Sequence, residues 1–390
     1  YTEKSSEGVY SMQGAATCVD NSTGNVVAIV GSRSQEDIKG YVLNRAYQSY
    51  RQPGSCIKPL NVYTPYLQLG NTPDTKVTDS QIDGGPANAD ASYAGEMTLT
   101  DAVKWSKNTV AWNIYQQITP KTGSCFLIKM GFHKIWVDKD YNAGALGGFT
   151  YGVTTEEMAG GYAALANDGV YRKATCIRLI VDASNKTVVN ETNRNSKVYD
   201  KSASRMMTQM LREVVLSGTG TSANVENAVV AGKTGTTNAS KDVWFCGYSR
   251  YYTTTVWAGY DYPKEMSGVN SRVNAIFKDF MTAVHTNLPV TDFSTVTQQT
   301  TQPETTAAVQ EETQSLPQET TAIVPEMETT GIEQVTPQQV PSTTTQVPTT
   351  TPYQRWTTAP AQPKTTAPMQ YGDIDATTRT DPDATARGEW

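Results

Sequence analysis

Short β-like runs rich in apolar residues lie at both ends of the first 290 residues. At the start, residues 14–20 and 25–31 are two such runs, separated by the turn-forming segment Asn21-Ser22-Thr23-Gly24. This pattern predicts an antiparallel β-hairpin. Three more β-like runs with short connecting turns predict an antiparallel meander. They cover residues 228–236, 243–249 and 253–260.

Helical spacing of apolar residues dominates the middle of the chain. Residues 99–118 keep one apolar face, with Thr100 or Asp101 as the expected N-cap and Pro120 as the expected end. A further helix over residues 156–167 is closed by the C-cap signal Asp168-Gly169. Another predicted helix begins at Ser55 and ends near Gly70, and two more cover residues 206–215 and 272–285.

The order of these elements indicates a fold class. Residues 71–96 are rich in Asp, Gly, Asn and Pro and predict a long surface loop, a kind that is often functional. Strands lie at the two ends of residues 1–290, and helices lie between them. We therefore expect an α+β domain whose hairpin and meander share one antiparallel sheet of about five strands.

Composition separates residues 291–390 from the rest of the chain. This segment is rich in Thr, Gln, Pro and Glu and holds 11 of the 19 prolines. It carries 4 Lys+Arg against 13 Asp+Glu, a net charge of −9, whereas residues 1–290 carry 28 against 25, a net charge of +3. A segment without apolar periodicity buries too little surface to offset its ordering entropy, so we expect disorder. Its acidity argues against nucleic acid as a partner.

The cysteines and the N-terminus limit the class of protein further. The five cysteines are widely spaced without a C-x-x-C pair, which favours buried unpaired thiols over structural zinc; we expect no metal and no other cofactor. The sequence begins with Tyr1, with no signal peptide and no run of 18 apolar residues. We therefore expect a fragment of a longer protein whose membrane anchor lies upstream.

One motif carries the expected nucleophile. Ser55-Cys56-Ile57-Lys58 is the only Ser-x-x-Lys in the chain and follows the turn dipeptide Pro53-Gly54. Ser55 is therefore expected at a helix N-terminus, where unpaired N–H groups and the helix dipole favour negative charge. Lys58 follows on the same face. A hydroxyl beside an amine at such a helix end is typical of an activated nucleophile. The alternative is an N-cap serine followed by a solvated lysine.

Two further motifs supply partners for this nucleophile. Ser106-Lys107-Asn108 lies on a predicted helix and offers a hydroxyl and an amide, which can relay a proton and hold a peptide carbonyl. Lys233-Thr234-Gly235-Thr236 lies in a β-like run, where an amine and two hydroxyls can meet a carboxylate and Gly235 lets substrate approach. Two decoys, Ser222-Ala223-Asn224 and Lys121-Thr122-Gly123, lie in a turn and in a predicted helix-to-loop break.

The base is expected to be a lysine. The only histidines, His133 and His285, lie in no Ser/His/Asp context. Lys58 would have to lose its proton during part of the cycle, which burial and the nearby cation of Lys233 would favour.

Together these motifs resemble the transpeptidase domain of class A penicillin-binding proteins over roughly residues 10–285. The resemblance extends to segments around the three motifs. These are Asn44-Arg45-Ala46, Arg51-Gln52-Pro53-Gly54, Leu146-Gly147, Met158-Ala159, Ala163-Ala164-Leu165-Ala166-Asn167-Asp168-Gly169-Val170-Tyr171, Gly218-Thr219-Gly220-Thr221, Ala231-Gly232, Thr237-Asn238 and Asp242-x-Trp244-Phe245.

The resemblance implies a peptidoglycan D,D-transpeptidase on the outer face of the cytoplasmic membrane. The nucleophile would attack a D-Ala-D-Ala stem peptide, release D-Ala and pass the acyl group to an amine of a neighbouring stem. β-Lactams would act as covalent inhibitors, and the N–H groups of Ser55 and Thr236 would form the oxyanion hole. The implied catalytic residues are Ser55, Lys58, Ser106, Asn108 and Lys233, and the implied substrate-binding residues are Thr234, Gly235 and Thr236.

Some features depart from the family pattern and leave alternatives open. The glycosyltransferase signature Glu-Asp-x-x-Phe-x-x-His-x-Gly is absent, and Cys56, which directly follows the nucleophile, is expected to serve packing. One alternative is a D,D-carboxypeptidase or β-lactamase-type hydrolase, although the β-lactamase pentad Glu-x-x-Leu-Asn is absent. The other is a non-enzymatic β-lactam-sensing domain.

Overall fold

The computed structural model describes residues 1–6, 8–33, 42–190 and 195–294. The predicted disordered tail, residues 291–390, lies outside the described residues from residue 295 onward. The described chain passes the predicted domain boundary at residue 290, because the ring of Phe293 packs edge-on against Tyr248 at a centroid distance of 5.5 Å. Contacts of the folded domain therefore extend at least to Phe293.

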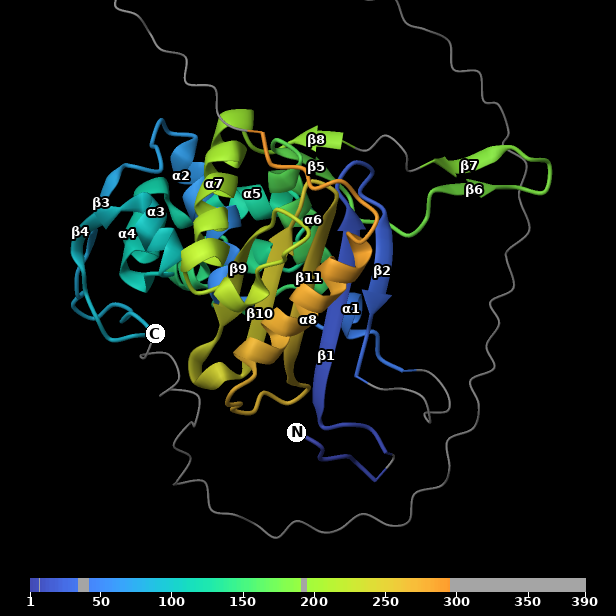
Figure 1. The fold of residues 1–390 in the computed structure, drawn as a ribbon, viewed down its shortest axis with the longest axis horizontal. Helices are drawn as coiled ribbons and strands as arrows, with labels where there is room; N and C mark the ends of the chain where they lie inside the picture. The colour runs from blue at the N-terminus through green and yellow to red at the C-terminus, as the bar shows by residue number, and fades with distance from the viewer. Residues whose placement is uncertain (7, 34–41, 191–194, 295–390) are drawn as a thin grey trace, which may run out of the picture. The chain divides into compact units, whose positions relative to one another are not determined.

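A five-stranded antiparallel sheet forms the centre of the fold, with strand order β2-β1-β11-β10-β9 (Figure 1). β1 pairs with β11 along its whole length, which places the N-terminal hairpin beside the C-terminal meander. The predicted hairpin, meander, shared sheet and α+β class are thus confirmed. The strands are β1 (Met12–Asp20), β2 (Val26–Val30), β9 (Ala231–Thr236), β10 (Asp242–Tyr248) and β11 (Tyr252–Tyr260).

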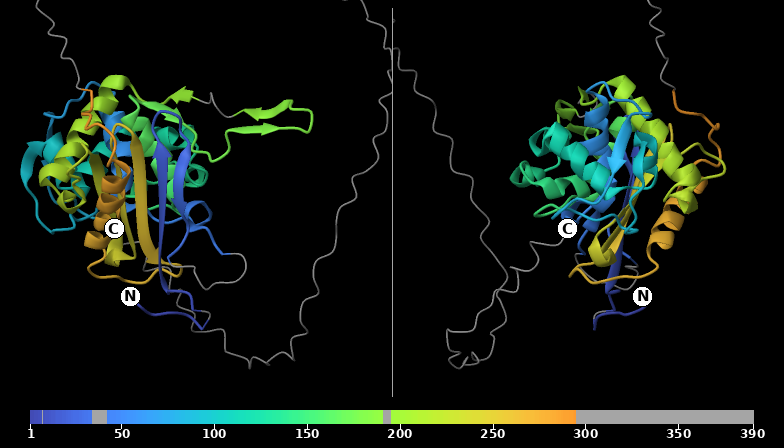
Figure 2. Two further views of the ribbon diagram at one scale, coloured as in Figure 1. Left: turned by 45° about the vertical axis from the view of Figure 1, so that its right-hand side comes forward. Right: turned by 90° about the vertical axis from the view of Figure 1, so that its left-hand side faces the viewer.

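Helices cover both faces of this sheet, and β10 is accordingly buried at every position. Successive side chains of a strand point to opposite faces. Phe245 packs in a cluster with α8 (Asn270–Val284), whereas Trp244 joins the larger core that includes α6 (Thr155–Ala166). Figures 1 and 2 show α8 and α6 on opposite sides of the sheet. The sheet is therefore the middle layer between two helical layers.

The helix predicted to begin at Ser55 is present, but it begins at Gly54 and is irregular. It starts as a 3-10 turn, continues as a π-helical turn and ends as an α-helical turn. Pro59 and Pro65 have no N–H to donate, which weakens a regular α-helical hydrogen-bond ladder. The three parts are η1 (Gly54–Ile57), η2 (Pro59–Tyr63) and α2 (Thr64–Leu67).

The predicted loop over residues 71–96 is only partly a loop. Two short strands at its ends pair antiparallel, so that Lys76 faces Thr98 and Asp79 faces Gly95. These strands are β3 (Lys76–Asp79) and β4 (Gly95–Thr98). This pairing brings together the two ends of the connection between the strands, residues 80–94.

The predicted single helix over residues 99–118 is wrong, because two helices cover this segment. Ser106, between them, has φ +58°, a left-handed conformation that cannot continue an α-helix. The predicted N-cap is also wrong, because the Thr98 hydroxyl caps the first helix by accepting a hydrogen bond from the N–H of Asp101. The two helices are α3 (Leu99–Lys104) and α4 (Asn108–Ile118).

A loop was predicted after Pro120. In the structure Pro120 instead begins a helix, α5 (Pro120–Lys129). Proline suits the first turn of a helix, since the N–H that it lacks would have no intrahelical partner there. The Thr119 hydroxyl caps this helix by accepting a hydrogen bond from Thr122 N–H. The predicted break at Lys121 is therefore the start of a helix.

The later helices lie where they were predicted. A capping box of Thr154 and Glu157 begins α6, and α7 (Lys201–Ser217) starts five residues before its predicted range. None of the described helices is both long and apolar enough to span a membrane. The remaining elements are α1 (Arg45–Gln48), η3 (Ile135–Asp138), η4 (Asn142–Leu146), β5 (Val170–Arg172), β6 (Leu179–Val181), β7 (Thr187–Asn190), β8 (Asn195–Lys197), η5 (Thr221–Ala223) and η6 (Asn238–Ser240).

Candidate active site

The helix start that carries Ser55 lies directly against β9. Gly54 has φ +51°, and a Cβ on it would lie only 2.7 Å from the carbonyl oxygen of Thr236. A Cβ on Gly235 would lie 2.8 Å from the Sγ of Cys56. Glycine at both positions lets the two backbones approach closely. The missing side chain of Gly235 thus has a packing reason, and a contact of Gly235 with substrate stays a prediction.

Cys56 joins the same two segments. It is fully buried, and its thiol donates to the carbonyl oxygen of Lys233 at 3.1 Å. Its own carbonyl accepts a hydrogen bond from the Tyr162 hydroxyl at 2.6 Å. These contacts agree with the expected packing role. All five cysteines are free, but the expectation of burial holds only for Cys18, Cys56 and Cys246, because Cys125 and Cys176 are exposed.

Lys58 is fully buried and is held by the turn between α3 and α4. Its Nζ donates to the carbonyl of Ser106 at 2.9 Å and to the side-chain oxygen of Asn108 at 2.7 Å. The carbonyl of Lys107 lies 3.4 Å away. The structure therefore brings two of the predicted motifs together, since Lys58 bridges the nucleophile segment and residues 106–108. We call these three residues the 106–108 turn.

The third motif, which contains Lys233, acts on Lys58 through electrostatic repulsion. Burial, together with the nearby cation of Lys233, lowers the pKa of Lys58 well below its usual value. Burial also lowers the pKa of Lys233, to about 8, and its Nζ donates to the carbonyl of Thr234 at 3.2 Å. Burial thus shifts both amines towards the neutral form, and the cation of Lys233 adds to this shift at Lys58.

Most of the other predicted site residues are more accessible than these two buried amines. Five predicted site residues are half-buried, as a site open to substrate requires: Ser55, Ser106, Asn108, Thr234 and Thr236. The hydroxyl of Thr234 shares a 2.8 Å hydrogen bond with that of Thr219, which the prediction did not include. Thr219 belongs to the Gly-Thr-Gly-Thr segment. Its contact with Thr234 can be recognised only in the folded structure, where that segment lies beside β9.

The decoy motifs have other partners. Ser222 accepts a hydrogen bond from Asn274 on α8 at 2.8 Å, and Thr122 shares one with Thr119 at the start of α5. The histidines also have partners of their own: His133 pairs with Glu157, and His285 bonds to Ser249.

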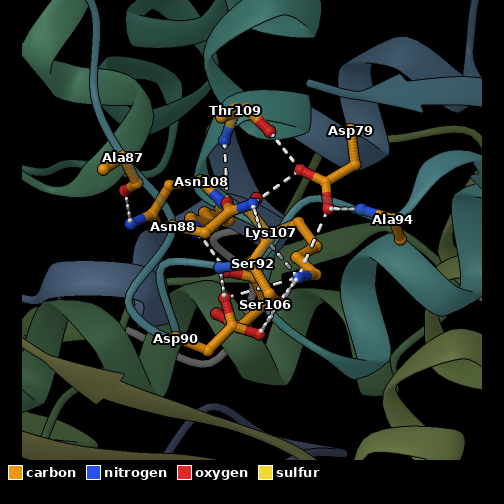
Figure 3. A network of polar contacts seen from close by, with 11 residues as sticks. Asp79, Ala87, Asn88, Asp90, Ser92, Ala94, Ser106, Lys107, Asn108 and Thr109 are labelled. Carbon is orange, nitrogen blue, oxygen red and sulfur yellow. Dashed lines mark hydrogen bonds and ion pairs between the residues drawn. The ribbon is translucent and has the colours of Figure 1, made fainter. Parts of the chain in front are cut away.

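Sequence reasoning missed two groups of residues that hold the site in place. One is a buried ion pair, in which Arg51 Nε lies 2.8 Å from Asp242 Oδ1. The other is a network around the 106–108 turn, in which Lys107 contacts Asp79 and Asn88 contacts Asn108 (Figure 3). Only the richness of residues 71–96 in Asp and Asn marked the second group in the sequence.

Comparisons with known sequences agree with this geometry. The family model described as the penicillin binding protein transpeptidase domain matches residues 14–282. Penicillin-binding protein 1A of Clostridium acetobutylicum is 33% identical over 309 residues, which are 75% of this chain and 38% of that protein. Penicillin-binding protein 1F of Bacillus subtilis is 35% identical over 283 residues, 69% of this chain and 38% of that protein. The chain thus spans about two fifths of the length of these curated relatives.

Solved structures show the same fold. The crystal structure of penicillin-binding protein 1A from Haemophilus influenzae matches with a TM-score of 0.60 at 25% identity, over 73% of this chain and 49% of that one. The PonA1 protein of Mycobacterium tuberculosis in complex with penicillin V matches with a TM-score of 0.62 at 22% identity, over 73% and 81%. With the family match, the two relatives and the shared fold, this chain belongs to the transpeptidase-domain family of the class A penicillin-binding proteins.

Proposed function

We propose that this chain is a peptidoglycan D,D-transpeptidase domain in which Ser55 forms an acyl-enzyme and Lys58 is its base. The observation that carries the proposal is the environment of Lys58, which is fully buried, bonded to the 106–108 turn and close to the charge of Lys233. A lysine acts as a base only when it is neutral, and both burial and a nearby cation favour the neutral amine.

Acylation begins when the Ser55 oxygen bonds to the carbonyl carbon of the penultimate D-Ala and its proton passes to Lys58. The N–H groups of Ser55 and Thr236 hold the resulting oxyanion. The intermediate collapses by breaking the C–N bond to the terminal D-Ala. Lys58 returns its proton through the Ser106 hydroxyl to the departing amine, which leaves Ser55 as an ester and restores neutral Lys58.

The donor stem is held at both ends of its last peptide bond. The C-terminal carboxylate binds the ammonium of Lys233 and the hydroxyls of Thr234 and Thr236, because charged and hydroxyl donors are the strongest partners for a carboxylate. The side-chain amide of Asn108 orients the backbone of the donor. Attack by an amine of a neighbouring stem on the Ser55 ester then forms the cross-link and frees the hydroxyl.

Labelling with a fluorescent penicillin tests the proposal, because a β-lactam carries a strained amide and a carboxylate in the positions of the D-Ala-D-Ala bond. Wild-type protein should be labelled, and Ser55→Ala and Lys58→Arg should not. The decoys supply matched controls: Ser106→Ala should slow labelling, whereas Ser222→Ala should not. Labelling of the Ser55→Ala protein would refute the assignment. Equal slowing of labelling by Ser106→Ala and Ser222→Ala would refute it as well.

The lifetime of the adduct separates this function from its alternatives. A hydrolase of the carboxypeptidase or β-lactamase type releases the adduct within seconds, and a sensor keeps it without any cross-linking. We expect a long-lived adduct, together with cross-linking of D-Ala-D-Ala donor stems to amine acceptors. We also propose that the domain acts outside the cytoplasmic membrane, where these stems are found.

A further inference from the structure

The connection between β3 and β4 docks on the 106–108 turn through buried polar side chains (Figure 3). Asp79 is fully buried at the end of β3, and Asn88 in the connection and Lys107 in the turn are each 5% exposed. Buried polar groups are costly unless they are paired. We call these three residues the Lys107 clamp, because each of them contacts at least one of the others.

Asn88 completes the start of α4 from outside the helix. Its side-chain oxygen accepts hydrogen bonds from the N–H groups of Asn108 at 2.7 Å and Thr109 at 3.3 Å. Within the described residues the N-cap residue, Lys107, provides no side-chain cap of its own. The first N–H groups of a helix need such acceptors. Asn88 also donates to Asp79 Oδ1 at 2.6 Å, so the cap is tied to the buried carboxylate.

Lys107 carries the charge that this carboxylate requires. Its Nζ lies 3.3 Å from Asp79 Oδ2 and 3.0 Å from Asp90 Oδ2, and it donates to the carbonyl of Ser92 at 3.1 Å. The Asp79 side chain is 0% exposed and that of Asp90 is 56% exposed. Burial opposes the charge of Lys107, but the hydrogen bonds to Asp90 and Asp79 outweigh it and raise its pKa. The pKa values of Lys107 and Lys58 are thus shifted in opposite directions.

The clamp and the base both contact the same turn. The three described acceptors of Lys58 Nζ all belong to the 106–108 turn, and two of them are main-chain carbonyls. Ser106 has φ +58°, a conformation that a residue other than glycine adopts at a cost of about 1 kcal/mol or more. The turn therefore needs contacts that hold it, and the Lys107 clamp provides contacts in addition to those of Lys58.

We propose that Lys107 is a positioning residue for the acylation of Ser55: through its ion pair with Asp79 it fixes the carbonyl and amide oxygens that bind Lys58. This inference rests on the proposed transpeptidase function. It assigns a role to the middle residue of the Ser-x-Asn motif and to the β3–β4 connection.

A set of matched variants tests whether the Lys107 clamp affects the rate of Ser55 acylation or only the thermal stability of the protein. Lys107→Met leaves the buried Asp79 carboxylate without its counter-ion, and Asp79→Asn leaves the Lys107 ammonium only the exposed carboxylate of Asp90, so both should lower the thermal midpoint. Each should also lower the second-order rate constant of penicillin acylation, by about 10- to 100-fold as for other residues that orient a catalytic group. Asp90→Asn is the control, because it removes the exposed carboxylate from the same ammonium; its rate should stay within about threefold of wild type.

The double variant Asp79→Asn/Lys107→Met separates the two roles. It leaves no buried charge unpaired, so the thermal midpoint should return towards the wild-type value. The acylation rate should stay low, because the ion pair that fixes the turn is still missing. Lys107→Arg keeps the charge and should retain more of the rate than Lys107→Met.

Three outcomes overturn the inference. The first is acylation at the wild-type rate in Lys107→Met. The second is a rate that recovers together with stability in the double variant, which would assign the clamp a structural role alone. The third is wild-type protein that penicillin does not label, which would overturn the proposed function as well; the first two outcomes would leave that function standing.

Discussion

The ion pair between Arg51 and Asp242 makes a prediction about how the nucleophile segment is anchored. Arg51 lies four residues before Ser55, and its Nε donates to Asp242 Oδ1 on β10 at 2.8 Å. The same carboxylate oxygen accepts from the indole N–H of Trp257 at 2.9 Å. Asp242→Asn keeps the size of the side chain and removes its charge. The guanidinium of Arg51 would then remain buried without its counter-ion.

The magnitude follows from comparison with a second ion pair of almost equal length. Lys197 Nζ lies 2.7 Å from Asp200 Oδ1, but these side chains are 68% and 52% exposed, against 9% and 4% for Arg51 and Asp242. Coulomb's law gives about 6 kcal/mol for the buried pair at an effective dielectric constant of about 20, and about 1.5 kcal/mol for the exposed pair at the value of water. Breaking a buried pair typically costs about 3–5 kcal/mol and an exposed pair less than about 1 kcal/mol.

Equilibrium unfolding in urea measures both values. We expect Asp242→Asn to lower the free energy of unfolding by about 3–5 kcal/mol. We expect Asp200→Asn, which keeps a residue suited to the start of α7, to lower it by less than about 1 kcal/mol, and less still in high salt. Equal losses in the two variants would refute the reasoning, because they would mean that burial does not decide the strength of these pairs.

Three further predictions concern the site and its support. Gly54→Ala should slow penicillin acylation and cost about 1–2 kcal/mol of stability, because Gly54 has φ +51° and a Cβ would lie 2.7 Å from the Thr236 oxygen; an unchanged labelling rate would contradict this. The second-order rate constant of acylation should rise with pH as Lys58 loses its proton and fall above about pH 8 as Lys233 loses the charge that binds the carboxylate; a steady rise to pH 10 in a stopped-flow series would argue against these roles. Thr154→Ala should remove the capping box of α6, cost about 1 kcal/mol in urea unfolding and leave the acylation rate of the folded protein unchanged; a slower rate would show that α6 affects the site.

The sheet could be predicted because its signals are local. Short β-like runs over residues 14–31 and 228–260, with turn residues between the runs, are enough to define a hairpin and a meander. The prediction that the hairpin and the meander share one sheet followed from the helices between them. With a helical middle, the strands at the two ends have only each other to pair with. The Ser-x-Asn and Lys-Thr-Gly motifs could be separated from their decoys for a similar reason, since the predicted local context differs around each copy.

The break at Ser106 could not be predicted, because its cause is not local. Residues 99–118 keep their apolar spacing through the break, so the pattern alone favours one helix. The left-handed turn is held by Lys58 and by Asp79, which come from η1–η2 and β3. The cap was missed for a related reason, since Thr98 and two other capping candidates lie within four residues and only the geometry selects one of them.

Lys107 is the clearest example of a residue whose environment could not be predicted from the sequence. In the motif it is the unspecified middle residue, and a lysine at that position predicts a solvated side chain. In the structure it is buried between two carboxylates from another segment. The residues of a motif that face substrate can be recognised from its pattern, whereas the residues that hold the motif in place depend on which distant loop packs against it.

The most direct test of the account is the position of the penicillin adduct. Intact mass and peptide mapping of wild-type protein treated with penicillin should find one adduct per chain, on the Ser55 hydroxyl, and Lys58→Arg protein should carry none under the same conditions. An adduct on another residue, or equal adduct formation in Lys58→Arg, would contradict the central claim that a buried neutral lysine activates Ser55.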